Sequence, residues 1–525
     1  MPDRPSPPDW LTLSRRRLLL GGAALGATAV GRSTLGPAWA WAGGPTIVDP
    51  FTLGVASGDP HPDGVVLWTR LAPEPLAGDG RGGMPDVPVT VEWQVATDEG
   101  FSQVVAQGIG DALPELGHSV HAEVTGLQSG AEYFYRFKTG LELSPVGRTK
   151  TAPATGAQVN HLAFAFISCQ HYMHGHYTAL QRMAEEDLDL VIHLGDYIYE
   201  DPPGLSLTVV RNHDGDGEPV TLHEYRNRHA LYKGDVNLQA AHAAFPWIVV
   251  LDDHEIDNDW ADEVPQDPNT QSHEAFLARR AAAFQAYYEH MPLRQSSLPS
   301  GIDMQLYRRL TFGDLVDFHV LDTRQYRSDQ VPSAQRGDPT RTILGDEQET
   351  WLRNAVAGPT ARWNVLAQQV FFSQRDYSSG PGQSFSTDGW DNYVVERNSL
   401  RDHLVAAGTS NPVVITGDIH ANFVCDVKAD FNDPGSATVA TELVGTSVSS
   451  KGDGTDQNLD DPDHLAENPH FKFINRNRGY VRNTITPSEW TVDFRIVDYV
   501  TLPGASVSTR ATFVIEDGQP GAEPA

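Results

Sequence analysis

Short apolar runs rich in β-branched and aromatic residues recur along the chain, and the pattern between them changes near residue 160. Before that point the runs at 65–68, 89–95 and 133–137 alternate in part between apolar and polar residues. Turn residues such as Gly80 and Gly130 separate these runs. Such alternation is typical of strands with one buried face. We therefore predict a small β-sandwich in the first part of the chain.

Beyond residue 160, almost wholly apolar runs alternate with helix-like stretches, of which 178–187 and 273–290 are examples. Apolar strands that alternate with helices predict an α/β domain whose strands are buried on both faces. The five clearest runs are 164–167, 190–194, 247–251, 316–321 and 413–416.

Polar side chains with metal-binding or proton-transfer chemistry stand within a few residues of the end of each of these five runs. In chain order they are Cys169; Asp196 and Tyr199; Asp253 and His254; Arg324 and Arg327; and Asp418 and His420. Ligands of α/β sheets bind beyond the carboxyl ends of the strands. We therefore expect these side chains to converge on one site.

The chemistry of this set favours metal ions. Carboxylates suit hard cations, whereas imidazole and thiolate suit iron or zinc, so the mixture predicts at least two metals of different character around Asp196. A phenolate ligand, Tyr199, favours a trivalent ion such as Fe³⁺. Taken singly, each residue also fits a structural role, such as a buried thiol, a cap or ordinary packing. Cys425 follows no such pattern and is predicted to be buried and structural.

Composition and charge exclude or disfavour several classes of protein. The chain has 525 residues, 40% of them apolar, which is enough for a large core and excludes global disorder. Its formal net charge of −31 disfavours stable nucleic-acid binding, because such a surface repels phosphate backbones. Two cysteines are too few for a disulfide scaffold.

The first residues have the composition of an export signal. Arg15, Arg16 and Arg17 precede a Leu-, Gly- and Ala-rich run that reaches Val30, and A-x-A cleavage motifs follow at 38–42. A charged segment, a short apolar segment and a small-residue site predict a signal peptide, and the paired arginines predict the twin-arginine route. The alternative is an amphipathic basic N-terminus. We expect no membrane anchor, the twin-arginine export machinery as a partner, and a periplasmic, cell-wall-associated or secreted protein.

These patterns divide the chain into five parts. They are a signal peptide at 1–42, an N-terminal β-sandwich domain at 43–150, a linker at 151–160, a catalytic domain at 161–516 and a flexible tail at 517–525.

Five ordered motifs carry a resemblance to a known family. They are Ser168-Cys169-Gln170, Gly195 to Glu200, Asp252 to Glu255, Asp322 to Arg327 and Gly417 to His420, with Arg478-Gly479-Tyr480 as a late block. Together with the segment 51–60 they resemble the PhoD-type alkaline phosphatases of the calcineurin-like metallophosphoesterase superfamily. The resemblance implies a two-sheet αββα sandwich preceded by a small all-β domain of immunoglobulin or fibronectin type.

The resemblance also implies a metal centre with one Fe³⁺ and one or two Ca²⁺ ions. Cys169, Asp196, Tyr199 and His420 would hold the iron, and Asp196 would bridge to calcium, which Asp253 and Asp418 also bind. The second calcium and the part played by Asn258 stay open. A metal-bridging hydroxide would attack phosphorus, and His254, beside Asp253, would protonate the leaving group. Arg324 or Arg327 would contact the phosphate, the alternative for both being a surface ion pair.

The predicted function is a secreted phosphatase that hydrolyses small phosphate monoesters and diesters for phosphate scavenging. Two alternatives remain from the sequence. One is a phospholipase D-like phosphodiesterase of the same family, and the other is a non-catalytic exported metal-binding protein.

Overall fold

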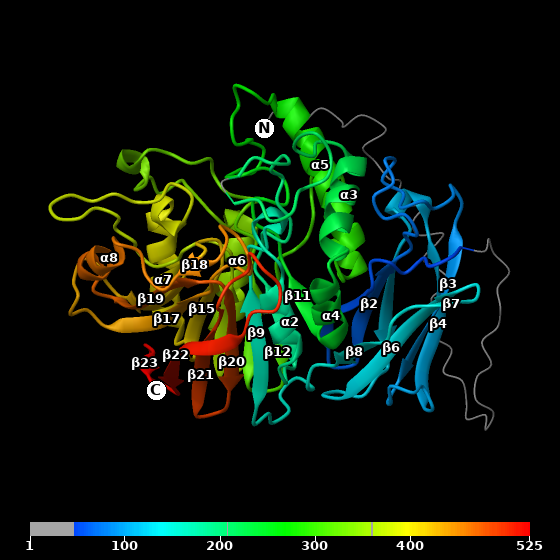
Figure 1. Cartoon of the computed structure of the whole chain (residues 1–525). Helices are drawn as coiled ribbons and strands as arrows, with labels where there is room; N and C mark the ends of the chain where they lie inside the picture. Colours follow the sequence, from blue (N-terminus) through cyan, green and yellow to red (C-terminus); the bar gives the residue numbers. More distant parts are fainter. Residues whose placement is uncertain (1–46, 207, 359–360) are drawn as a thin grey trace.

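The computed structural model describes residues 47–206, 208–358 and 361–525, which form three β-sheets and their covering helices (Figure 1). The predicted signal peptide at 1–42 lies outside the described residues. The N-terminal strands lie at one end of the molecule, and the chain from the C-terminal half lies at the other.

The largest sheet has ten strands. They are β1 (Val55–His61), β2 (Gly64–Arg70), β5 (Ser119–Thr125), β9 (Leu162–Ile167), β10 (Leu190–His193), β11 (Pro246–Val249), β20 (Gly479–Ile485), β21 (Glu489–Val497), β22 (Val507–Glu516) and β23 (Glu523–Pro524). Their order is β23-β22-β21-β20-β9-β10-β11-β1-β2-β5. The central strands β9, β10 and β11 are parallel and wholly buried, which explains their continuous apolar sequences.

The second sheet has eight strands. They are β12 (Arg308–Phe312), β13 (Val316–Val320), β14 (Trp363–Ala367), β15 (Pro412–Thr416), β16 (Asn422–Lys428), β17 (Thr438–Val444), β18 (Gly454–Thr455) and β19 (Phe471–Asn477), in the order β12-β13-β14-β15-β17-β16-β19-β18. Strands β13, β14, β15 and β17 are parallel, so the loops after β13, β14 and β15 leave one edge of the sheet.

The two large sheets pack face to face. The rings of Phe164 and Phe318, one from each sheet, lie 5.2 Å apart, and Trp363 and Trp490 are 5.8 Å apart. On β14, Val365 belongs to this shared core, whereas its neighbour Leu366 faces the opposite way. This alternation is what a strand buried on both faces requires.

Helices cover the outer faces of both sheets. They are α2 (Thr178–Ala184), α3 (Leu222–Lys233), α4 (Val236–Ala244) and α5 (His273–His290) near the ten-stranded sheet, α6 (Gly345–Ala357) and α7 (Val394–Ala407) against the eight-stranded sheet, and α8 (Asp461–Glu467) beside β19. The predicted helices at 178–187 and 273–290 correspond to α2 and α5, and the predicted αββα architecture is confirmed. None of the helices in the described ranges is long and apolar enough to cross a membrane.

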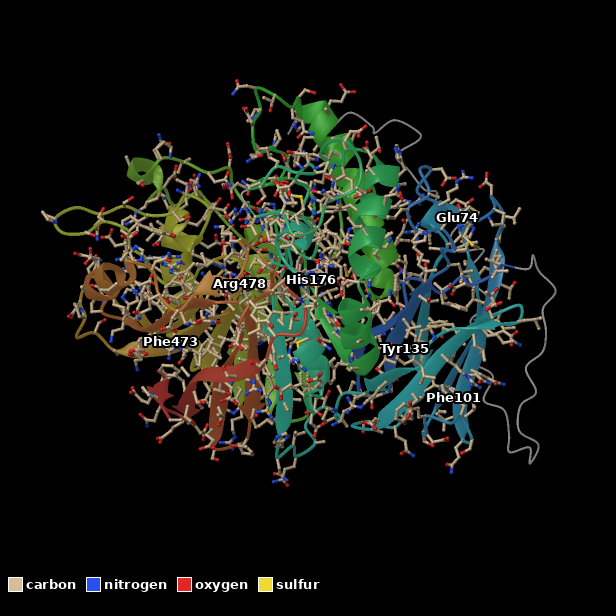
Figure 2. The ribbon with its side chains drawn as sticks, in the orientation of Figure 1. Glu74, Phe101, Tyr135, His176, Phe473 and Arg478 are labelled. Atoms are coloured by element: carbon tan, nitrogen blue, oxygen red, sulfur yellow. The ribbon has the colours of Figure 1, made fainter. Side chains whose placement is uncertain are left out.

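The N-terminal region is all β, as predicted, but it shares a sheet with the rest of the chain. A five-stranded sheet consists of β3 (Val89–Ala96), β4 (Val104–Ala112), β6 (Glu132–Thr139), β7 (Glu142–Leu143) and β8 (Gly147–Lys150). It packs on β1, β2 and β5 through a core that includes Trp93 and Tyr135, the second of which Figure 2 labels. Because β1 pairs in parallel with β11 (Ser57 beside Pro246), the sandwich is completed by the end of the ten-stranded sheet.

The segments at the two ends of the predicted catalytic domain are held by hydrogen bonds, strand pairing and an ion pair. In the segment predicted as a linker, Ala152 N–H donates to the carbonyl of His61, and Ala152 is buried. The structure differs from the predicted flexible tail at 517–525, because β23 pairs with β22 and Lys472 forms a 2.7 Å ion pair with Glu523. The pairing of a short edge strand with a distant segment cannot be predicted from a short polar sequence such as 517–525.

Gly58 marks the junction between β1 and β11, and its replacement tests that junction. A Cβ atom there would lie 2.4 Å from the carbonyl oxygen of Pro292 and 2.8 Å from that of Trp247. We expect Gly58→Ala to lower the free energy of unfolding by about 1–3 kcal/mol, because backbone must shift to admit the methyl group. Gly110→Ala in β4 is the control, since its Cβ would meet only Val120 at 3.6 Å. Equal urea midpoints for both variants would contradict this assignment.

The protein has buried neutral histidines, and we therefore expect its free energy of unfolding to fall in mild acid. Burial lowers the pKa of His193 to about 3 and, against a hydrogen bond with the Gln374 carbonyl, that of His470 to about 4. Below an unfolded-state pKa of about 6.5 the unfolded chain takes up protons that the folded chain refuses, so stability falls as the pH drops from 6.5 to about 4. The cost reaches about 3 kcal/mol per histidine at pH 4. Urea unfolding of the wild type and of His193→Phe from pH 7.5 to 4.5 measures it, and the variant should show the shallower slope.

Candidate metal centre

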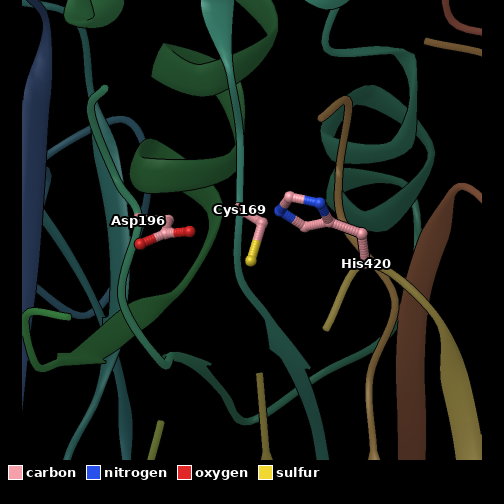
Figure 3. Close-up of side chains that lie close together, drawn as sticks. All are labelled: Cys169, Asp196 and His420. Atoms are coloured by element: carbon pink, nitrogen blue, oxygen red, sulfur yellow. The ribbon is translucent and has the colours of Figure 1, made fainter. Parts of the chain in front are cut away.

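Loops from both large sheets bring the predicted ligands together. Ligand atoms of Cys169, Asp196 and His420 lie within 4.8 Å of one another, and so do those of Asp196, Asp253 and His254. Cys169 follows β9, Asp196 follows β10, Asp253 follows β11 and His420 follows β15. Figure 3 shows Cys169 between Asp196 and His420. Asp196 belongs to both groups.

Tyr199 completes the first group. Its hydroxyl lies 2.7 Å from Asp196 Oδ2 and 3.1 Å from His420 Nε2, and Ser450 Oγ donates to it at 2.9 Å. The predicted iron set of one thiol, one carboxylate, one phenol and one imidazole is therefore present at a single point.

The second group is richer in carboxylates. Asp418, which is in neither group, is half-buried, and burial raises its pKa well above the usual range, with Asp252, Asp388 and Asp253 adding to the effect. Burial likewise raises the pKa of Asp253, but Arg324 and His254 outweigh it, so this pKa is lowered. Asn258 donates its backbone N–H to Glu200 at 2.8 Å.

The backbone at four of these ligands adopts a left-handed conformation. The φ angles are +59° at Cys169, +56° at Asp196, +61° at Asp418 and +57° at His420. This conformation costs a non-glycine residue roughly 1–3 kcal/mol and persists only where the surrounding structure enforces it. Here it turns each side chain sharply from the end of its strand towards the site.

The residues present fit a group of cations. Burial raises the pKa of Asp196 well above its ordinary value, despite His254, and raises that of the Cys169 thiol, to which Asp196 and Asp418 add. Asp196 Oδ1, Asp253 Oδ1 and His420 Nδ1 are buried without a hydrogen-bond partner among the described residues. Acidic groups packed this closely are stable as anions only beside positive charge.

Glu255 is a supporting residue that sequence reasoning missed. Its carboxylate accepts N–H groups from Asp196 at 3.2 Å, Tyr197 at 2.6 Å and Asp252 at 2.8 Å. It thereby joins the loop after β10 to the loop after β11. Three backbone donors to one buried carboxylate can be found only in three dimensions, although Glu255 lies within a motif that the sequence singled out.

His254 lies over the site with one ring nitrogen committed. Its Nδ1 lies 2.7 Å from Glu200 Oε2, and its ring stacks on that of Tyr199 at 4.1 Å. Burial lowers the pKa of His254, but the carboxylates of Glu200, Asp253 and Asp196 outweigh it and hold this pKa well above its ordinary value. His254 is therefore the imidazole of the second group, and the carboxylates around it favour its protonated form.

Arg324 and Arg327 lie elsewhere than expected. Both are fully buried, so the alternative of a surface ion pair is wrong. Arg324 binds Asp388 through two nitrogens at 2.7 and 2.8 Å and Asp252 at 2.5 Å, and Arg327 binds Asp388 at 2.6 Å. These carboxylates bind the guanidinium N–H groups that were expected to contact phosphate. Asp388, whose pKa the two arginines hold well below its usual range against burial, is a second residue that sequence reasoning missed.

Helix α3 holds Tyr199 from behind. Tyr232 Oη accepts the N–H of Tyr199 at 3.1 Å, and Arg228 donates to the Tyr199 carbonyl. Tyr232 Oη also lies 2.9 Å from His213 Nε2. The ring of His171 lies against the Tyr199 ring in a tilted contact, with ring centres 4.3 Å apart. The phenol is thus fixed at its backbone and over its ring.

The remaining sequence motifs also have definite places. Arg478 of the late block, near the middle of the molecule in Figure 2, donates to the His420 carbonyl at 2.7 Å and to that of Gly452 at 2.8 Å. It braces the loop that carries His420. Cys425 is buried in β16, within an apolar cluster, as predicted.

Comparisons with known proteins agree with this architecture. The family described as PhoD-like phosphatase matches residues 164–494, and its N-terminal domain family matches residues 38–153. Alkaline phosphatase D of Bacillus subtilis (strain 168) is 53% identical over 482 residues, which are 90% of this chain and 82% of that protein. A solved structure described as "Structure of PhoD" is 52% identical, with a TM-score of 0.89, and the match covers 92% of this chain and 93% of the other.

Removing the Tyr232 hydroxyl tests whether this hydroxyl holds the backbone of Tyr199 in place. Tyr232→Phe leaves the N–H groups of Tyr199 and Tyr172 without an acceptor, so we expect a loss of about 1–3 kcal/mol in unfolding free energy. Tyr287→Phe is the control, because the Tyr287 hydroxyl is buried without a partner in the described part of the chain. Chemical denaturation should show Tyr287→Phe unchanged or more stable, and equal losses in both variants would refute the assigned role.

Proposed function

Because the chain belongs to the PhoD-like phosphatase family and is a phosphoric ester hydrolase, we propose that it uses iron and calcium to hydrolyse phosphate monoesters and diesters outside the cytoplasm. The observation that carries the proposal is the pair of ligand groups that share Asp196. One group has the thiol, phenol and imidazole that suit Fe³⁺, and the other has the carboxylates that suit Ca²⁺.

The proposed ligands divide between two kinds of ion and share Asp196. Cys169, Asp196, Tyr199 and His420 would hold Fe³⁺, while Asp196, Asp253 and Asp418 would hold Ca²⁺. When bound, such ions neutralise phosphate oxygens and lower the pKa of water in the site. The chain itself supplies the shape of the site, because the strained backbone at four of the six residues fixes the directions of their side chains.

His254 is the proposed proton donor. Glu200, as a carboxylate, accepts from Nδ1, so this contact orients the ring and leaves Nε2 for the leaving-group oxygen. The surrounding carboxylates hold the pKa of His254 high, against its burial, and the imidazole therefore carries a proton when the ester bond breaks. Stacking on Tyr199 keeps the ring over the site.

Arg324 acts on the ligands instead of the phosphate. Its guanidinium lies 2.5 Å from Asp252 and 3.7 Å from Asp253 Oδ1, and Asp388 holds its other edge. The cation keeps Asp253 ionised and fixes its direction, which a calcium ligand requires. Arg327 supports this role through Asp388.

We place the protein in the periplasm, the cell wall or the medium, with the twin-arginine machinery as its export partner. The paired arginines at residues 15–17 and the short apolar run that follows them support this location. A ligand set drawn from four separate strands forms only in the folded chain, which suits a route that carries folded proteins. The acidic net charge favours small phosphate esters over long polyanions, and phosphate scavenging is the physiological role that we propose.

Replacement of the shared ligand tests the proposal. In Asp196→Asn we expect the hydrolysis of p-nitrophenyl phosphate to fall at least about 1,000-fold, because both ligand groups lose a charge. Elemental analysis of the exported wild type should find iron and calcium, and the variant should retain less of both. Asp426→Asn, which affects only the 3.2 Å pair with Lys472, is the control.

Three results would contradict the proposal. Unchanged turnover in Asp196→Asn would remove the catalytic assignment, and zinc as the sole metal would remove the assignment of iron and calcium. Hydrolysis of phosphatidylcholine without any hydrolysis of p-nitrophenyl phosphate would favour the phospholipase-like alternative.

A further inference from the structure

Arg375 is a buried arginine whose guanidinium has no hydrogen-bond or ion-pair partner among the described residues. It lies in the loop after β14, its exposed fraction is 5%, and its Nε is buried without an acceptor. A guanidinium carries a permanent charge, so leaving its Nε donor unpaired in the interior is costly. The fold alone gives no reason for this charge.

Three other buried arginines are paired with carboxylates. Arg324 and Arg327 bind Asp388, and Arg397 binds Asp391 at 2.6 Å. The backbone N–H of Arg375 itself donates to Asp391 at 2.8 Å, so acidic groups are close to this loop while the guanidinium is held away from them.

Three aromatic rings fix the position of the Arg375 guanidinium. Its central carbon lies 4.5 Å from the ring centre of Tyr377, 4.9 Å from that of Phe423 and 5.4 Å from that of Phe371. These rings orient the group but accept none of its in-plane N–H donors in the way that an oxygen does. The guanidinium is therefore preorganised for an oxyanion.

The position of Arg375 connects it to the metal centre. Phe423, on which it stacks, is three residues from His420 and is the second residue of β16, the strand after that ligand loop. Burial lowers the pKa of Arg375 and the charge of Arg476 adds to this effect, while Tyr377 and Asp418 oppose it; Arg476 is itself bound to Asp461 at 2.6 Å. Arg375 thus follows β14, and the loop after β14 leaves the same edge of the sheet as the loop after β15, which carries Asp418 and His420.

We propose that Arg375 binds a phosphoryl oxygen of the substrate, either on the scissile phosphate or on a second phosphate of the same molecule. The inference rests on the proposed function. Phosphate offers the planar pair of acceptors that a guanidinium matches, and it supplies the negative charge that the fold withholds from Arg375. The sequence suggested this role for Arg324 and Arg327. In the structure, the N–H groups of those two arginines bind carboxylates instead.

Arg375→Met tests the contact, because methionine keeps an apolar stem against the three rings. We expect the KM for phosphate esters to rise roughly 10-fold to 100-fold, the loss expected for a hydrogen bond to a charged group. Inorganic phosphate should bind the metal-loaded variant more weakly by a similar factor in titration calorimetry. The melting temperature should be unchanged or higher, since the variant removes a buried unpaired charge.

Two further variants control the experiment. Arg375→Lys keeps the charge without the planar donor pair, and we expect an intermediate KM. Arg136→Met removes another stacked arginine, 3.9 Å from the Phe101 ring and bound to Gln94, in the five-stranded sheet. Its KM and its phosphate affinity should equal those of the wild type.

Comparison of adenosine 5′-monophosphate with adenosine 3′,5′-bisphosphate separates the two sources of phosphate. Equal increases in KM for both substrates place Arg375 on the scissile phosphate, and an increase for the bisphosphate alone places it on the second phosphate. Unchanged KM values and unchanged phosphate affinity would overturn the inference, and so would a fall in melting temperature without these changes. A wild type that binds phosphate but hydrolyses no ester would instead refute the proposed function.

Discussion

The metal centre depends on the burial of acidic side chains where two sheets meet. Burial raises the pKa of Asp196 and of Asp418 well above the usual range, and the carboxylates of Asp252 and Asp253 add to the effect at both. Such crowding opposes folding unless cations enter. The surrounding structure therefore has two tasks: to hold these groups in place against their repulsion, and to present their oxygens to ions of the right size.

Backbone donors and arginines perform the first task. Glu255 ties the loop of Asp196 to that of Asp252 through three N–H groups, and Arg324 links Asp252 to Asp388. Helix α3 fixes Tyr199 from the other side. Because each support joins loops from different strands, the ligand geometry is a property of the whole α/β body, and the left-handed backbone at four ligands is the strain that this body sustains.

The N-terminal strands are part of the same support. Strand β1 pairs with β11, and Arg308 bridges Asp59 of β1 at 2.7 Å and the carbonyl of Val249, the last residue of β11, at 3.0 Å. Asp252 and Asp253 follow three and four residues later. The region that looked like an accessory sandwich in sequence thus braces the strand that delivers the second group of ligands.

The sequence by itself determined the buried strands and the candidate ligands, because buried parallel strands are continuously apolar and the chemistry follows directly at their ends, while the two-sheet class followed from the resemblance to a known family. Cys169, Asp196, Tyr199 and His420 were predictable for this reason, and the structure brings all four together. Only the tertiary structure decided what depends on contacts between distant segments: the sharing of a sheet by β1 and β11, the supports Glu255 and Asp388, and the partners of the arginines. Arg324 and Arg375 look alike in sequence, and one is saturated by carboxylates while the other has none, since pairing is set by which loops the fold places side by side.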